Sequence, residues 1–175
     1  MIEQFTPKQG FFVGVDSDGC VFDTMEVKHK ECFIPNIIKY YGLASVSKYA
    51  REAGEFVNLY SKWRGINRFP ALFMTLDLLE ERPEVQRRGV KVPKLAAVRQ
   101  WAEKETKLAN PALTQAVEST GNDELRHCLE WSKAVNATIA ETVKEVPPFP
   151  NVRESLAKLA KHADIIVVSA TPNEA

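Results

Sequence analysis

Two strand-like runs stand near opposite ends of the sequence, and their spacing constrains the fold more than any other feature. The first covers residues 11–15 (FFVGV) and the second covers residues 164–168 (DIIVV). Both are short, rich in β-branched or aromatic residues and apolar at adjacent positions, which is typical of strands covered on both faces. We therefore predict two buried parallel strands, with about 150 residues of other structure between them.

The interval between these runs predicts helices almost throughout, from about residue 26 to residue 146. Apolar residues recur there at helical spacing, and the stripes stop at glycine or proline. Residues 147–150 (PPFP) follow as a stiff linker in which a helix is nearly impossible. Asn151 is the predicted cap of a further helix, with Glu154 completing a capping-box pair. This order indicates an α/β domain that is interrupted by a helical one.

Composition excludes several classes of function. Lys and Arg together number 23, as do Asp and Glu, so the net charge is zero and gives no support for binding nucleic acid or a membrane surface. The three cysteines, Cys20, Cys32 and Cys128, are far apart and show neither zinc-site nor disulfide-framework spacing. No signal peptide or membrane-spanning run is recognisable. We expect a cytoplasmic protein in a reducing compartment.

Polar residues of chemical interest follow both strand-like runs. Asp16 and Asp18 come after the first run, and Ser169 comes after the second. Ligands of parallel sheets bind at the carboxyl ends of strands, so these side chains would converge if the strands are neighbours. One carboxylate can act as a nucleophile and the other as a general acid and base, and together they suit Mg²⁺. The alternative is an acidic turn without a catalytic role.

The same residues carry a resemblance to a known family. Residues 13–19 (VGVDSDG) resemble the first motif of the haloacid dehalogenase (HAD) superfamily, which is an apolar strand followed by Asp-x-Asp. Residues 167–171 (VVSAT) resemble its second motif, a strand that ends in Ser or Thr. The helical interval sits where many members insert a cap, and residues 150–152 (PNV) are similar to the usual Pro-Gly-Val return into the core.

This resemblance implies a fold and a division into domains. The fold would be α/β, a Rossmann-like parallel-sheet core with an all-α cap inserted after the first strand. Residues 1–24 would form the first part of the core and residues 25–146 the cap. Residues 147–175 would contribute the linker, a helix, the second strand and the second motif.

The resemblance also implies roles for the residues at the strand ends. Asp16 would be the nucleophile and a Mg²⁺ ligand, and Asp18 the general acid and base and a second ligand. Ser169 and Ala170 would bind the phosphoryl group. The implied function is a Mg²⁺-dependent phosphatase that acts on a small phosphorylated metabolite through an aspartyl-phosphate. Cys20 stands where the family most often has Thr or Val, and we interpret it as a packing residue.

The family's later motifs, a Lys and an acidic pair, do not occur before the sequence stops at Ala175. We therefore expect a truncated core with little or no activity alone, and with a tendency to self-associate. Two alternatives stay open. One is a phosphomutase of the same superfamily, and the other is a non-catalytic assembly fragment with a vestigial site.

A short polar segment inside the helical interval is the candidate for substrate recognition. Arg64, Asn67 and Arg68 lie between two predicted helices, and two guanidinium groups with an amide suit an anionic or polar substrate. The alternative is a solvated connection between helices.

Overall fold

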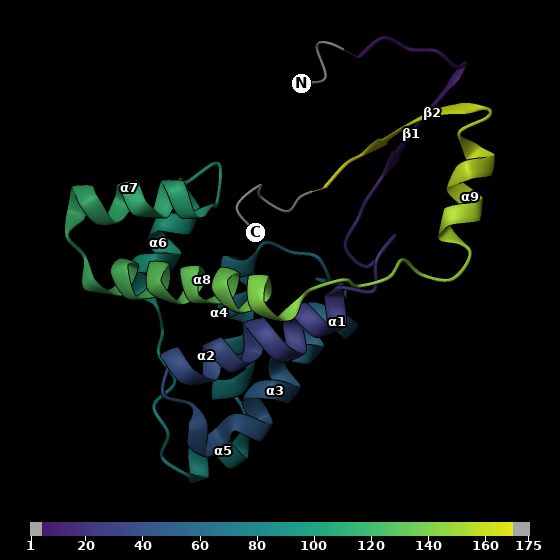
Figure 1. The fold of residues 1–175 in the computed structure, drawn as a ribbon. Coiled ribbons are helices and arrows are strands. Elements are labelled where there is room, and N and C mark those ends of the chain that lie inside the picture. The colour runs from purple at the N-terminus through teal and green to yellow at the C-terminus, as the bar shows by residue number, and fades with distance from the viewer. Residues whose placement is uncertain (1–4, 170–175) are drawn as a thin grey trace. The chain divides into compact units, whose positions relative to one another are not determined.

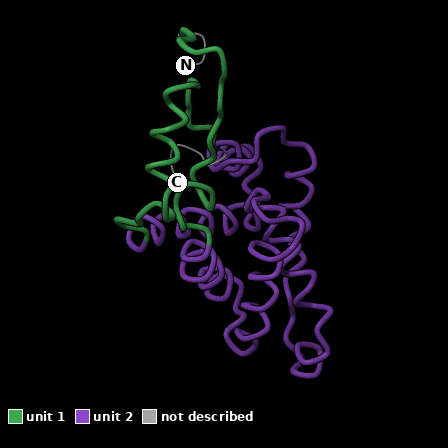
Figure 2. Tube along the Cα trace, turned by 90° about the vertical axis from the view of Figure 1, so that its right-hand side faces the viewer, with its two compact units in different colours: residues 1–25, 143–175 green, residues 26–142 purple. Residues whose placement is uncertain are grey.

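The computed structural model describes residues 5–169, and the chain divides into two compact units (Figures 1 and 2). Unit 1 combines Met1–Met25 with Val143–Ala175, and unit 2 is Glu26–Thr142. Figure 2 colours unit 1 green and unit 2 purple. Because the chain leaves unit 1 once and returns once, unit 2 is an insertion between two sequence-distant parts of unit 1.

Unit 1 contains a parallel pair of strands. β1 (Phe11–Val15) pairs in parallel with β2 (Ala163–Val167), and Val15 lies opposite Val167. The helix α9 (Val152–Leu159) comes directly before β2. Two parallel strands need a long crossover between them, and here all of unit 2 and α9 lie in that crossover.

The predicted α/β, Rossmann-like parallel-sheet core is wrong. The described residues are mostly helical, and their sheet has two strands. A Rossmann-like core is an open parallel sheet with helices on both faces, which two strands and α9 do not make. The prediction failed because the larger sheet came from the resemblance and not from the residues, which contain two strand-like runs.

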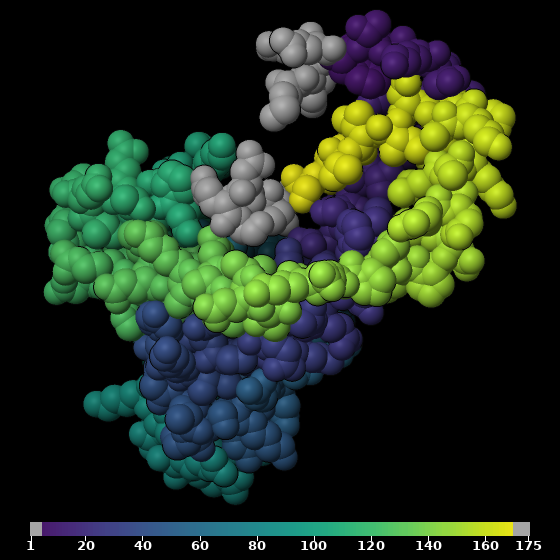
Figure 3. All heavy atoms as spheres, in the orientation of Figure 1, coloured from purple at the N-terminus to yellow at the C-terminus, as the bar shows by residue number. Residues whose placement is uncertain are grey.

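The prediction that both strands are buried is also wrong. Phe11 is 74% exposed, Phe12 is 54% exposed and Val167 is 72% exposed. Residues of β2, in yellow, are visible at the surface in the space-filling view (Figure 3). Strands become buried when further layers cover both faces of their sheet, and α9, which has no buried residue, provides no such cover.

Asn151 precedes α9 but does not cap it through its side chain. Its φ is 65°, in the left-handed region, and its side chain makes no capping hydrogen bond. N-cap residues usually have an extended backbone, from which the side-chain oxygen reaches the first free N–H groups. The left-handed conformation, which Asn tolerates, removes that geometry, so the predicted capping box is not formed.

The long interval between the strands is helical, as predicted, and most of the buried core of the described chain lies in unit 2. Helix α3 packs on α4, and α8 contacts α2, α6 and α7. No helix of residues 5–169 combines the length and the apolar composition needed to cross a membrane. The helical segments in chain order are α1 (Met25–Val27), η2 (Lys28–Phe33), α2 (Ile34–Tyr40), η3 (Ala44–Val46), α3 (Ser47–Glu55), η4 (Phe56–Tyr60), α4 (Arg68–Glu80), α5 (Pro83–Arg87), α6 (Ala96–Lys104), α7 (Asn110–Thr120) and α8 (Asp123–Thr142).

Two of these segments, η2 and η4, are π-helices, in which each backbone N–H bonds five residues back instead of four. In or next to each π-helix, the side-chain amide of an asparagine donates to the backbone carbonyl four residues earlier. Asn36 Nδ2 donates to the carbonyl of Cys32 at 2.8 Å, and Asn58 Nδ2 donates to the carbonyl of Gly54 at 2.8 Å. Both Asn side chains are buried, so these bonds satisfy polar groups that water does not reach.

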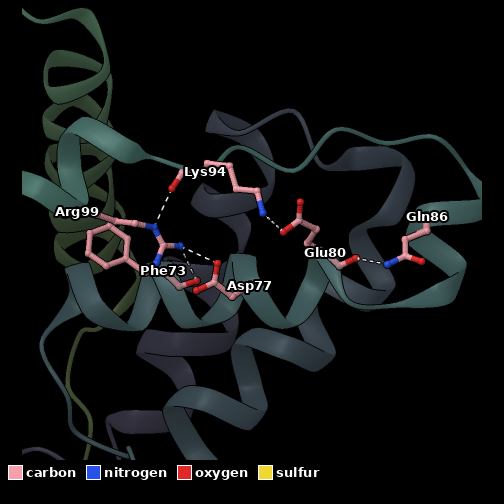
Figure 4. Close-up of polar contacts among 6 residues, drawn as sticks. All are labelled: Phe73, Asp77, Glu80, Gln86, Lys94 and Arg99. Atoms are coloured by element: carbon pink, nitrogen blue, oxygen red, sulfur yellow. Dashed lines mark hydrogen bonds and ion pairs between the residues drawn. The ribbon is translucent and has the colours of Figure 1, made fainter.

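Arg99 of α6 contacts two residues of α4 through its side chain (Figure 4). Its Nη2 donates to Asp77 Oδ1 at 2.7 Å, and its guanidinium lies 4.7 Å from the centroid of the Phe73 ring. Its Nε donates to the carbonyl of Lys94 at 2.8 Å. The charge of Arg99 therefore has a carboxylate partner, and its contacts are those of a packing residue.

Candidate active site

The end of β1 positions Asp16. The carbonyl of Val15 accepts the N–H of Val168 at 2.9 Å, so strand pairing holds the backbone up to the residue before Asp16. The Asp16 side chain is exposed, and its Oδ1 accepts the N–H of Ser17 at 2.8 Å. The strand thus presents a carboxylate to solvent from a backbone that is held in place.

The loop after Asp16 folds back tightly on itself. The N–H groups of Val21 and Phe22 both donate to the carbonyl of Ser17 at 3.0 Å, and the N–H of Gly19 donates to the carbonyl of Phe22 at 2.8 Å. Gly19 has a φ of 71°, a left-handed conformation that glycine adopts without strain. This turn brings Asp18 back towards the residues that follow it.

Thr24 orients Asp18. The Thr24 hydroxyl is buried at the end of the loop and donates to Asp18 Oδ1 at 2.6 Å. A short hydrogen bond to a carboxylate is a strong one, so it restricts the rotation of Asp18. The sequence prediction missed Thr24, because a threonine six positions after an acid has no recognisable motif.

The proline linker, residues 147–150, makes backbone contacts with the same loop. The N–H of Phe149 donates to the carbonyl of Val21 at 2.9 Å, and Phe22 bridges Pro148 in antiparallel fashion. The two ends of the insertion are therefore held together within unit 1, close in the chain to the acidic pair.

Ser169 lies at the same edge of the sheet as Asp16. It is exposed and stands two residues beyond the end of β2, whose last pair is Val15 with Val167. Because the strands are parallel and paired in register, their carboxyl ends meet at one edge. Ala170 lies outside the described residues.

The two acids supply a donor set that fits Mg²⁺. Among residues 5–169, no group of three or more His, Cys, Asp and Glu side chains is placed to hold a metal ion. Mg²⁺ commonly keeps several waters and binds proteins through one or two carboxylates together with substrate oxygens. Asp16 and Asp18 can provide those carboxylates, because each ionised carboxylate has two oxygens with about four lone-pair sites.

Arg64 and Asn67 have structural roles in unit 2. Arg64 Nη1 donates to the carbonyl of Leu59 at 3.2 Å. Asn67 caps α4, since its Oδ1 accepts the N–H of Phe69 at 3.0 Å, while its Nδ2 donates to the carbonyl of Leu108 at 2.9 Å. These bonds direct the two side chains to different parts of the unit.

Arg68 reaches in a third direction, to α8. Its Nη1 donates to Ser132 Oγ at 3.0 Å and to Asn136 Oδ1 at 2.6 Å. Each of the three side chains therefore has hydrogen-bond partners of its own in unit 2, and none of these bonds joins two of the three. The sequence prediction missed Ser132 and Asn136, although two polar residues four apart within the apolar stripe of a helix are a usable signal.

Cys20 is exposed, so its interpretation as a packing residue is wrong. It lies in the tight turn after Gly19, where the chain is at the surface of unit 1.

No protein-family model matches the sequence, and no curated protein or solved structure matches it either.

Proposed function

We propose that the chain carries the phosphoryl-transfer site of a Mg²⁺-dependent phosphatase for a small phosphorylated metabolite. The observation that supports this most is the placement of Asp16 and Ser169 after two strands that pair in parallel and in register. The similarity of residues 13–19 to the first HAD motif supplies the reaction type. Membership of that superfamily is part of the same proposal.

Each residue has a distinct role in the proposed reaction. Asp16 attacks the phosphorus, a P–O bond forms to its carboxylate, and the bond to the leaving oxygen breaks. Asp18 gives its proton to that oxygen and takes one from the water that hydrolyses the aspartyl-phosphate, which releases inorganic phosphate. A bound Mg²⁺ offsets the repulsion between carboxylates and phosphate. The hydrogen bond from Thr24 keeps Asp18 oriented for both proton transfers.

Beryllofluoride tests the nucleophile directly, because it binds an aspartate in the presence of Mg²⁺ and imitates the aspartyl-phosphate. We expect ¹⁹F NMR to show bound beryllofluoride with the 175-residue chain. Asp16→Asn should abolish that signal, since it removes the oxygen that binds beryllium. Asp23→Asn is the matched control, because Asp23 is a nearby exposed acid without a proposed role, and it should bind as the unsubstituted chain does.

Two results would contradict the proposal. If Asp16→Asn binds beryllofluoride as well as the unsubstituted chain, Asp16 is not the nucleophile. If neither chain binds it with Mg²⁺ present, the non-catalytic alternative is favoured. Hydrolysis of p-nitrophenyl phosphate is a second measurement, in which the 175-residue chain should show little or no activity because the later motifs are missing, and high turnover would contradict that expectation.

A further inference from the structure

Arg68 is a partly buried cation that has no acidic partner among residues 5–169. Burial lowers the pKa of its guanidinium to about 10. Its acceptors are all neutral: the carbonyl and hydroxyl of Ser132 and the amide oxygen of Asn136. No Asp or Glu of residues 5–169 forms an ion pair with it. A cation partly removed from water without a counter-charge is costly, so this arrangement needs an explanation.

Arg99 shows how the same unit treats a packing arginine. Both guanidinium groups lie over a phenylalanine ring, Arg99 over Phe73 at 4.7 Å and Arg68 over Phe33 at 5.2 Å. Arg99 also has Asp77 at 2.7 Å (Figure 4). Arg99 therefore has a carboxylate that compensates its positive charge, whereas Arg68 does not.

One edge of the Arg68 guanidinium is open. All of its hydrogen bonds come from Nη1, so Nε and Nη2 donate to no acceptor within the described part of the chain. Neither of these two nitrogens is sealed from solvent. The Nε and Nη2 groups form a planar fork that matches two oxygens of a phosphate or carboxylate.

The other edge is held rigidly. Ser132 is fully buried, and its hydroxyl donates to Asn110 Oδ1 at 2.6 Å while it accepts from Arg68. Residues of α7 and α8 and the Phe33 ring thus fix the guanidinium before any ligand arrives. Preorganisation of this kind lowers the entropy cost of binding.

We propose that Arg68 is the centre of an oxyanion-binding site in unit 2, which takes the phosphate or carboxylate of a small molecule on its Nε and Nη2 groups. The proposed site consists of residues of unit 2, and oxyanion binding there needs neither Asp16 nor Asp18 nor a metal ion. The competing explanation is that Arg68 only joins α4 to α8.

The first test uses the unsubstituted 175-residue chain with ¹⁵N-labelled arginine. Inorganic phosphate and acetate are added separately, with NaCl at matched ionic strength as the control. We expect a saturable shift of the Arg68 Nε–H resonance with phosphate, acetate or both, and the stronger of the two identifies the preferred group. Arg68→Lys identifies the resonance. If neither anion moves it beyond the effect of NaCl, the proposal is overturned, whatever the stability of any variant.

The second test compares variants by thermal unfolding with and without the preferred anion. Arg68→Gln should weaken binding by at least about tenfold and remove the anion-dependent rise in Tm. Arg99→Gln should keep that rise even where it lowers Tm itself, because its charge is already paired. Asp16→Asn should also keep it, which separates this site from the proposed catalytic one. An unchanged rise in Arg68→Gln, or its loss in Asp16→Asn, would place the anion elsewhere.

Discussion

At the scale of single residues, Tyr41 and Cys128 show what burial does to ionisable groups whose hydrogen-bond partners are weak. The Tyr41 hydroxyl is enclosed, and its polar neighbour is a thiol, which is a weak hydrogen-bond partner. It lies beside the thiol of Cys128, with Glu124 also near. Burial raises the pKa of Tyr41 well above its ordinary value and raises the pKa of Cys128 to about 12. Both groups are therefore neutral in the folded chain far into the alkaline range.

The sign of the resulting pH dependence follows from these pKa values. In the unfolded chain the two groups ionise near pH 9 to 10 (about their model-peptide values), whereas in the folded chain they keep their protons. Unfolding then releases protons, so stability is full below about pH 9 and falls as the pH rises towards about 12. Urea denaturation at a series of pH values would measure this loss, and a midpoint that does not fall over this range would contradict it.

Tyr41→Phe tests the contribution of the hydroxyl. We expect it to raise the free energy of unfolding by up to about 1 kcal/mol at pH 7, because it removes a buried hydroxyl whose polar neighbour is a thiol, a weak acceptor. Above about pH 10 the gain should grow, because the unfolded variant has no phenol to ionise. A loss of more than about 1 kcal/mol at pH 7 would instead show that the hydroxyl makes a strong hydrogen bond.

At the scale of elements, Gly54 sets how closely α3 packs against α2. A Cβ at this position would lie 2.8 Å from Ile34 Cγ1, closer than non-bonded Cβ contacts in proteins, and 3.0 Å from Ile34 Cδ1, which is tighter than most of them. Ile34 is fully buried and cannot move aside into solvent. The absence of a side chain at Gly54 therefore lets α3 and α2 approach closely, although glycine has a lower helix propensity than alanine.

Gly54→Ala should lower the free energy of unfolding by about 1 to 3 kcal/mol through overpacking, although alanine favours the helix by about 1 kcal/mol. In an Ile34→Ala background the clash disappears, so the same change should be neutral or stabilising. Chemical denaturation of the four chains of this double-mutant cycle measures the coupling. If Gly54→Ala is equally destabilising in both backgrounds, contact with Ile34 is not the cause.

At the scale of the whole molecule, the two units differ in how much they bury. In unit 1, the buried residues of the described chain are Thr24, Met25 and Ala163. Unit 2 encloses a full set of large side chains, including Phe69, Leu76 and Trp131. Since buried apolar area is the main source of folding free energy, unit 2 should carry most of the stability.

We expect residues 26–142 expressed alone to fold and to unfold cooperatively in urea, with a midpoint close to that of the main transition of the whole chain. Hydrogen exchange on the 175-residue chain is the complementary measurement, and β1 and β2 should exchange much faster than α4 and α8. A fragment that shows no cooperative transition would mean that the core of unit 2 depends on unit 1.

The local features of this chain could be predicted from its sequence. The strand at residues 11–15 is confirmed, the second lies one residue earlier than predicted at Ala163–Val167, and the proline linker is not helical. Periodicity and proline geometry act over a few residues, so they leave a signal in the sequence itself. The placement of Asp16 directly after a strand could be predicted for the same reason.

What surrounds each element was decided by tertiary structure. The sequence pattern of β1 and β2 indicates buried strands, yet Phe11 and Val167 are exposed because burial depends on which layers cover a sheet. Likewise, the sequence predicts the same role for Arg64 and Arg68, since both lie in one polar segment. In the structure, however, α8 places polar acceptors beside Arg68. Contacts between residues 64 positions apart, such as Arg68 with Ser132, arise when helices pack, and no local pattern encodes them.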